Sequence, residues 1–176
     1  MIPTLTTNRL ILRPFCANDL DQYMTMVGDR DVMRFIGAGV TMDRMSSFHS
    51  LASILGHWAL RGYGLWAVEE KATGALVGRI GFFNPEGWPG LEVGWMLGRD
   101  HWGKGYATEG AAACLEWGFD TQGMTDVISC IQPRNVASIA VAERLGQRQI
   151  REERLQGIPV LIYGMDRKDW QNLRTV

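Results

Sequence analysis

The sequence predicts one α/β domain, built on a single mixed, mostly antiparallel sheet of about seven strands with helices on both faces. Three observations support this fold class. A chain of 176 residues, 46% hydrophobic and 21% charged, has the size and composition of one globular domain. Its short apolar and longer amphipathic segments follow the order βααβββαβαββ. Hairpins come first and one β-α-β crossover follows, which does not match a doubly wound parallel sheet. We take residues 1–176 as the domain, with a core of about residues 8–170.

Seven short apolar segments are expected as strands. Pro14 ends the first, because proline has no N–H for a sheet ladder. The segment Lys71–Gly74 joins the second and third as a hairpin, and the turn-rich loop Asn84–Gly90 precedes the fourth. The expected strands are Leu10–Pro14, Leu65–Glu69, Ala75–Phe82, Leu91–Leu97, Val127–Ile131, Gln149–Glu152 and Val160–Met165.

Helices are expected where apolar residues recur three and four positions apart. The first spans Ala17–Val27, and a polar joint with a short helical segment, Val32–Phe35, leads to a second at Thr41–Arg61. A third starts near Tyr106 and carries a stripe of mostly small residues suited to close packing on a sheet. A fourth, Asn135–Leu145, is followed by Gly146 as a left-handed stop. Residues 166–170 are expected as a tail.

The glycine-bearing turn Trp102–Tyr106 is the most informative local feature, since it connects a strand directly to a helix N-terminus. Glycines let the backbone approach a ligand closely, and the N–H groups of a first helical turn lack partners. The helix dipole adds roughly half a positive charge there. This arrangement predicts a cradle for a phosphate or pyrophosphate group.

Other interpretations of this turn fit the residues less well. The run from Gly98 to Lys104 matches the P-loop of nucleoside triphosphatases except for its final Ser or Thr, which is Gly105 here and could not bind Mg²⁺. A dinucleotide fingerprint would need Gly or Ala where Thr108 stands, after a βαβ unit that is absent. A turn that merely links strand to helix is the remaining alternative.

Composition excludes several other classes of protein. A net charge of −1 provides no general attraction for nucleic acid or membrane surfaces. The N-terminus does not resemble a signal peptide and no apolar run is long enough to span a membrane, so we expect a cytoplasmic protein. Three widely spaced cysteines and three histidines without metal-site spacing predict neither disulfides nor a metal centre. These six residues are Cys16, Cys114, Cys130, His49, His57 and His101.

Several segments, in this order, resemble the GNAT superfamily of acyl-CoA N-acyltransferases, and most closely its RimJ/RimL-type branch, which acetylates protein N-terminal amines. The matching segments span nearly the whole chain. They are Thr7–Arg13, Val32–Gly37, Glu92–Leu97, Trp102–Glu109, Asn135 with Ser138, Arg144–Gly146, and Tyr163 with Met165.

This resemblance implies that the cradle holds the pyrophosphate of acetyl-CoA. Its backbone N–H groups would come from Trp102, Gly103, Lys104, Gly105, Tyr106, Ala107 and Thr108. The resemblance further implies that the strand at Glu92–Leu97 diverges from the strand at Val127–Ile131. The pantetheine arm would lie in that gap along Trp95, Met96 and Leu97, with Asn135 bonding to it, capping its helix, or doing both.

Attack of an amine on a thioester needs a route for the amine's proton, donors for the oxyanion and an acid for the sulfur. Glu92 is the candidate base, and Ser138, one helical turn after Asn135, is the candidate acid, with Tyr163 as an alternative. Many GNAT members place a tyrosine where this chain has Ala142. Asp100 stands where many members carry Arg or Gln, which alters the expected phosphate contacts.

The acceptor pocket is expected between the joint at Asp29–Phe35 and the two closing strands, with Asp31, Phe35 and Glu92 as candidate substrate-binding residues. The leading hypothesis is transfer of an acetyl group to a protein or peptide N-terminal α-amine by direct attack in a ternary complex. Acetylation of a small amine (a polyamine, an amino acid or an aminoglycoside) is the near alternative. A non-catalytic CoA-binding module and a nucleoside triphosphatase are more distant ones. No nucleic-acid or membrane partner is expected, and the chain is expected as a monomer or homodimer.

Overall fold

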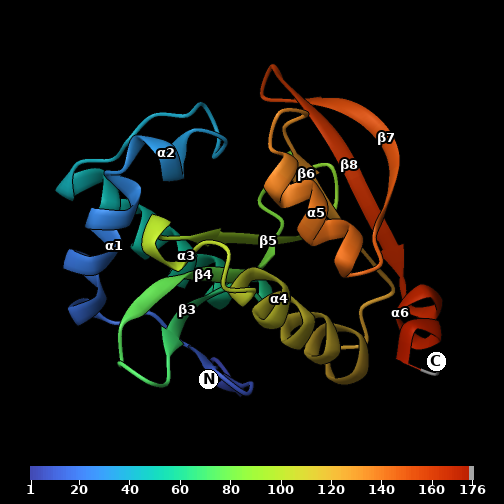
Figure 1. Cartoon of the computed structure of the whole chain (residues 1–176), viewed down its shortest axis with the longest axis horizontal. Helices are drawn as coiled ribbons and strands as arrows, with labels where there is room; N and C mark the ends of the chain where they lie inside the picture. The colour runs from blue at the N-terminus through green and yellow to red at the C-terminus, as the bar shows by residue number, and fades with distance from the viewer. Residues whose placement is uncertain (175–176) are drawn as a thin grey trace.

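The computed structural model describes residues 1–174 and contains one eight-stranded sheet flanked by helices (Figure 1). The strand order is β1-β2-β3-β4-β5-β6-β8-β7, and all neighbouring pairs except β5–β6 are antiparallel. The mixed, mostly antiparallel sheet expected from the sequence is therefore confirmed. The strands are β1 (Leu5–Thr6), β2 (Leu10–Arg13), β3 (Leu65–Glu70), β4 (Leu76–Phe83), β5 (Glu92–Leu97), β6 (Asp126–Ile131), β7 (Arg148–Leu155) and β8 (Ile158–Asp166).

The helices also follow the expected order. Two elements were not expected, one near each end of the described chain. The two-residue strand β1 pairs with β2, and a helix forms where a tail was expected. The α-helices are α1 (Leu20–Val27), α2 (Arg30–Met33), α3 (Arg44–Arg61), α4 (Tyr106–Glu116), α5 (Val136–Arg144) and α6 (Arg167–Arg174). Short 3₁₀ turns precede α1 (Ala17–Asp19) and follow β5 (Arg99–His101), and a π-helical segment continues α4 (Trp117–Thr121).

Small residues let α4 lie close to one face of the sheet. A Cβ built on Gly110 would come 2.6 Å from the Ile80 side chain, and one on Gly118 would come 2.6 Å from the Phe82 ring. Both contacts are too short for a real Cβ, so a larger residue at either position would force the Ile80 or Phe82 side chain, or the helix, to shift. The buried residues Ala111, Cys114 and Leu115 complete the stripe predicted from the sequence.

An aromatic cluster joins the helices to the sheet at the other end of α4. The rings of Trp58 and Trp66 lie 4.7 Å apart between centroids, and Trp117 lies 5.1 Å from Trp66 and 6.1 Å from Phe82. Trp58 also donates its indole N–H to the Leu65 carbonyl at 3.0 Å. This cluster fixes α3, β3 and the end of α4 as one body.

The N-terminal part of the fold, with α1, α2 and α3, and the C-terminal part, with α5 and β6 to β8, lie at opposite ends of the sheet in Figure 1. Strand β5 lies between them. Its carboxyl end leads into the 3₁₀ turn and then to α4, so residues from both parts and from α4 meet along this one strand.

A buried ion pair connects β2 to the helix that follows it. Asp19, almost fully buried, accepts two 2.8 Å bonds from the Arg13 guanidinium and a third from the Cys16 N–H. Burial alone would raise the pKa of Asp19, but these three donors outweigh it and hold that pKa below its usual value.

Asp19→Asn should therefore lower the free energy of unfolding by about 1–3 kcal/mol at pH 7, because the half-buried Arg13 guanidinium loses its two bonds to a buried carboxylate and keeps only Glu69 as a charged partner. A carboxylate with a lowered folded-state pKa stabilises the protein above its unfolded pKa and loses that effect as the pH falls. The difference from wild type, measured by urea unfolding, should thus shrink toward pH 3.

The exposed Asp21, which pairs with Arg44, is the matched control, and Asp21→Asn should change stability by no more than about 0.5 kcal/mol. Equal effects of the two substitutions at pH 7 would contradict the importance given to the Arg13–Asp19 pair.

Candidate functional site

Strands β5 and β6 separate almost as soon as they meet. Their ladder contains one residue pair, Glu92 with Ile128, whereas β4 and β5 pair over six positions. The Ser129 hydroxyl donates to the Val93 carbonyl at 2.7 Å and closes the junction. Beyond Val93, the edge of β5 that faces β6 is left open. The gap expected between these two strands is therefore present.

A groove of about 880 Å³ follows this open edge from β5 to the start of α4. Strand β5 forms its floor through Trp95, Met96 and Leu97, and α5 forms one wall through Asn135 and Ser138. The other lining residues come from α2 and the segment after it, the glycine turn and the body of α5. They include Val32, Phe35, Trp102, Gly103, Gly105, Tyr106, Ala107, Thr108, Ala137 and Val141.

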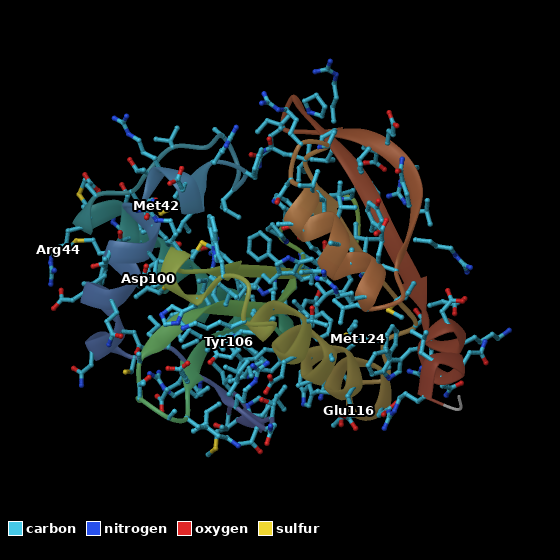
Figure 2. The ribbon with its side chains drawn as sticks, viewed as in Figure 1. Met42, Arg44, Asp100, Tyr106, Glu116 and Met124 are labelled. Carbon is cyan, nitrogen blue, oxygen red and sulfur yellow. The ribbon has the colours of Figure 1, made fainter. Side chains whose placement is uncertain are left out.

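The glycine turn has the backbone geometry of an anion cradle. Gly103 and Gly105 have φ angles of +72° and +82°, which favour glycine strongly. Across residues 1–174 no protein acceptor is found for the backbone N–H groups of residues 103–108. Figure 2 labels Tyr106 at the N-terminus of α4, where the first of these helical N–H groups lie.

Arg9 holds the turn in place from outside the groove. Its guanidinium donates to the Lys104 carbonyl at 2.8 Å and pairs with Glu109 at 2.6 Å. Glu109, in the first turn of α4, also accepts from the Thr7 hydroxyl at 2.6 Å. Burial raises the pKa of Glu109, yet these bonds outweigh it and keep that pKa below its usual value. The first segment of the chain thus braces the loop before α4.

The side chains of the turn contribute less to the groove than its backbone does. Lys104 is exposed and does not line the groove, although its carbonyl anchors Arg9. Trp102 is about half exposed and donates its indole N–H to the Leu97 carbonyl at 2.9 Å. Asp100 lies in the 3₁₀ turn before them and is exposed.

A smaller cavity of about 280 Å³ lies on the other side of the β5–β6 junction. Its walls are mainly apolar and come from β5, β6, the loop before β5, and the turn between β7 and β8. The charged side chains among its lining residues are Glu92 and Arg79. The cavity shares six lining residues with the groove, namely Phe35, Ile36, Trp95, Met96, Asn135 and Ser138. The two spaces therefore adjoin across the middle of β5.

Glu92 is a carboxyl group taken out of water. Burial raises its pKa to about 7, even though the Trp88 indole donates to it at 2.6 Å and the Cys130 N–H at 3.2 Å. Both donors, and the charge of Arg79, favour the ionised form and limit the rise. The remaining accessible surface of Glu92 faces the small cavity. A carboxyl with a pKa near 7 is suited to accept a proton at neutral pH.

Asn135 and Ser138 lie where the groove and the cavity adjoin. The Asn135 side-chain oxygen accepts from the Ser138 N–H at 3.3 Å, so Asn135 caps α5 and its amide N–H groups stay available. The Ser138 hydroxyl accepts from the Trp95 indole at 3.3 Å. Because that bond uses a lone pair of the oxygen, the serine proton is free to be donated elsewhere.

The remaining predicted site residues differ in their placement. Phe35 lines both spaces. Asp31 lines the groove rather than the small cavity, and its carboxylate pairs with Arg99 at 2.9 Å. Tyr163 is buried beside Ile131 and Ala142 and lines neither space, and burial raises the pKa of its hydroxyl.

Three features of the site were not predicted from the sequence: the Trp88 donor, Arg79 in the small cavity, and the brace formed by Arg9 and Glu109. Trp88 lies in the loop that was identified only as turn-rich. Its spacing of four residues before Glu92 is the one signal that could have suggested it. Arg79 sits inside an expected strand, where an arginine normally suggests a solvent-facing position.

No helix among residues 1–174 combines the length and apolarity needed to cross a membrane. In the same residues, no group of three or more His, Cys, Asp or Glu side chains is arranged to hold a metal ion.

Comparison with known proteins agrees with the geometry. Residues 9–148 match the acetyltransferase (GNAT) domain. The chain is 34% identical to YkkB of Bacillus subtilis, covering 90% of this chain and 93% of that protein. It is 31% identical to YnaD of the same organism, named an N-acetyltransferase, with 82% of each chain covered. An acetyltransferase structure from Agrobacterium tumefaciens superposes with a TM-score of 0.81 at 32% identity, covering 94% of this chain and 95% of that one. The chain belongs to the GNAT family of N-acetyltransferases.

Proposed function

We propose that this protein transfers an acetyl group from acetyl-CoA to an α-amine at the N-terminus of a protein or peptide, by direct attack in a ternary complex. The observation that carries this proposal is Glu92. It has a pKa of about 7 and faces a small cavity that adjoins the groove at the middle of β5. The acceptor amine would enter this cavity.

The groove suits coenzyme A in shape and in chemistry. Its unbonded N–H groups at residues 103–108 form a cradle for a pyrophosphate at a helix N-terminus. The open edge of β5 leaves the backbone groups of Trp95 and the Leu97 N–H free to bond an extended amide-bearing arm, whereas the Leu97 carbonyl already accepts from Trp102. Asn135, whose amide N–H groups remain available, faces the same stretch.

The bound cosubstrate would supply a thioester carbonyl that is open to attack by a neutral amine. Glu92 would accept the proton of that amine, directly or through a water in the cavity. An α-ammonium group has a pKa of about 8 and a lysine side chain about 10.4. Proton transfer to a carboxylate of pKa about 7 is therefore uphill by roughly one pKa unit from an α-ammonium group and by more than three pKa units from a lysine side chain. This difference favours an α-amine.

Ser138 is the residue proposed to donate a proton to the departing sulfur. Its hydroxyl lies between the two spaces and accepts from Trp95, which orients the hydroxyl and leaves its proton free. Tyr163 remains the alternative, but its burial away from both spaces makes it the less direct donor.

Acetylation of a small amine is the second candidate, and the size of the acceptor cavity favours it. About 280 Å³ holds a small molecule or a single N-terminal residue, and the β7–β8 turn limits the space through Leu155 and Ile158. A panel of acceptors monitored by thiol release separates the two functions. Activity on peptides with free α-amines supports the first, and activity on small amines alone supports the second.

Gly105→Ala should weaken coenzyme A binding about tenfold, measured by calorimetry. It forces a left-handed φ of +82° on a residue with a Cβ and places that Cβ 3.4 Å from the Arg9 guanidinium. Gly74→Ala is the matched control, because Gly74 has a φ of +71° in the β3–β4 hairpin and nothing within 4 Å of an added Cβ. Equal affinities in both variants would show that the cradle does not contact the cofactor.

Glu92→Gln should lower kcat/KM about a hundredfold or more, the usual effect of removing a general base. Wild-type kcat/KM should rise with pH through a midpoint of about 7, because only the ionised carboxylate accepts a proton. The variant should lose this step while coenzyme A binding is unchanged. Glu86→Gln removes an exposed carboxylate from the neighbouring loop and should have no effect on kcat/KM. Full activity of Glu92→Gln would exclude the assigned role.

Trp88→Phe should move the same midpoint to higher pH by about one unit. The substitution keeps an aromatic ring but removes the N–H that stabilises the ionised form of Glu92. Trp170→Phe, which removes a buried indole N–H that has no partner within residues 1–174, should leave the midpoint in place. An unchanged profile in Trp88→Phe would mean that Glu92 does not set the pH dependence.

A further inference from the structure

We infer that the acceptor carries a carboxylate in addition to its amine, and that Arg79 binds this carboxylate in the small cavity. The inference rests on the proposed function and specifies the substrate class of the same site. Its basis is a half-buried guanidinium that has no partner within the described protein.

Arg79 and Glu92 face the same space from adjacent strands. In the β4–β5 ladder, Arg79 pairs with Met96 and Phe83 pairs with Glu92. Side chains four residues apart on a strand share one face, so Glu92, Met96 and Arg79 all lie on one side of the sheet. Both charged residues line the cavity, and the charge of Arg79 lowers the pKa of Glu92.

Arg79 differs from the other half-buried arginines of the described chain. Arg13 pairs with Asp19 and Glu69, and Arg167 donates two bonds to the Met124 carbonyl. The Arg79 side chain forms no hydrogen bond and no ion pair with residues 1–174; its one specific contact is the Tyr23 ring, 6.0 Å from the guanidinium carbon. The contact with Tyr23 positions the side chain but does not neutralise its charge.

A guanidinium removed from water without an anion is costly, so an unpaired one in a cavity indicates that its counter-charge arrives with a ligand. Glu92 is the negatively charged residue that lines the same cavity, yet it forms no ion pair with Arg79. Its carboxylate accepts hydrogen bonds from the Trp88 indole and the Cys130 N–H instead. An acceptor that brings an amine toward Glu92 and a carboxylate toward Arg79 would match both charges of the cavity.

A carboxylate fits this cavity better than a phosphate does. The planar guanidinium presents two parallel N–H groups that match the two oxygens of a carboxylate. The cavity is small and mainly apolar, and Arg79 is the one cationic residue that lines it in the described part of the chain, whereas the cradle for phosphate lies in the adjoining groove. Arg79 does not line that groove, so it is not positioned to bind the cofactor.

Two sources could supply such a carboxylate: the acidic side chain of a peptide's first residue, or a carboxylate of a small amino acid. Glu92 and Met96 are four residues apart, so about 13 Å of strand separates the Cα of Glu92 from the position paired with Arg79. Glu92 and Arg79 both line the cavity. The acceptor can therefore span several ångströms between its amine and its carboxylate.

The test compares acceptors that differ only in carboxylate or amide. Peptides beginning with Asp or Glu are paired with those beginning with Asn or Gln, and free amino acids are paired with their amides. In wild type, kcat/KM should be at least about tenfold higher for the carboxylate member, mainly through KM. Arg79→Gln should abolish this preference, and Arg79→Lys should keep part of it, because lysine retains the charge but loses the two-pronged geometry.

Arg44→Gln is the matched control for loss of an arginine. Arg44 pairs with Asp21 on the surface, lies at the outer edge of the molecule in Figure 2, and does not line the cavity. The Arg44→Gln variant should keep the full preference for the carboxylate member of each pair. Unchanged coenzyme A affinity and melting temperature in Arg79→Gln would confirm that the variant is folded and that its groove is intact.

Equal kcat/KM for the two members in wild type, or a preference that survives Arg79→Gln, would overturn the inference while leaving the acetyltransferase proposal in place. If no acceptor is turned over, the same pairs are measured by binding to the CoA-saturated protein. A carboxylate preference that is lost in Arg79→Gln would then support carboxylate binding by Arg79, even though the proposed acetyl transfer had failed. Absence of any preference in that binding assay would overturn the inference.

Discussion

The separation of β5 from β6 is the constraint on which the rest of the site depends. Two parallel strands that stayed paired would satisfy each other's backbone groups and leave no groove. Here the ladder holds one pair, Glu92 with Ile128, and the carboxyl half of β5 is free on that side. Trp95 to Leu97 thereby line the groove, and the same opening lets α5 bring Asn135 and Ser138 to its edge.

The junction that opens the groove also creates the unusual environment of Glu92. The carboxyl lies at the last paired position, surrounded by Trp88, Cys130 and apolar cavity walls. Burial there raises its pKa to about 7, and the folded protein is destabilised by holding the charge in that place. Proton acceptance at neutral pH and this loss of stability have one physical cause, because both follow from removing the same carboxylate from water. Arg79 adds a second unneutralised charge to the same cavity.

Sequence periodicity and turn chemistry were sufficient to predict the sheet, the helix order and the glycine turn at the start of α4. Those features depend on local signals such as Gly103, Gly105 and the small residues of α4. The extra strand β1 and the helix α6 were missed because a two-residue strand and a polar terminal helix have almost no pattern of their own. Trp88 and Arg79 were missed for a different reason. Their roles come from long-range register, which brings β4 and the loop before β5 against Glu92, and no local spacing encodes that contact for Arg79.

Our proposal depends on Glu92 being a carboxyl of raised pKa where the groove and the small cavity adjoin. The most direct test is a ¹³C NMR titration of glutamate-labelled, CoA-saturated protein, with the Glu92 carboxyl signal assigned by its absence in Glu92→Gln. A titration midpoint near 7 is the predicted result. A midpoint near the ordinary value of 4.5 would contradict the account, because the carboxylate would then be too weak a base to draw a proton from an α-ammonium group efficiently.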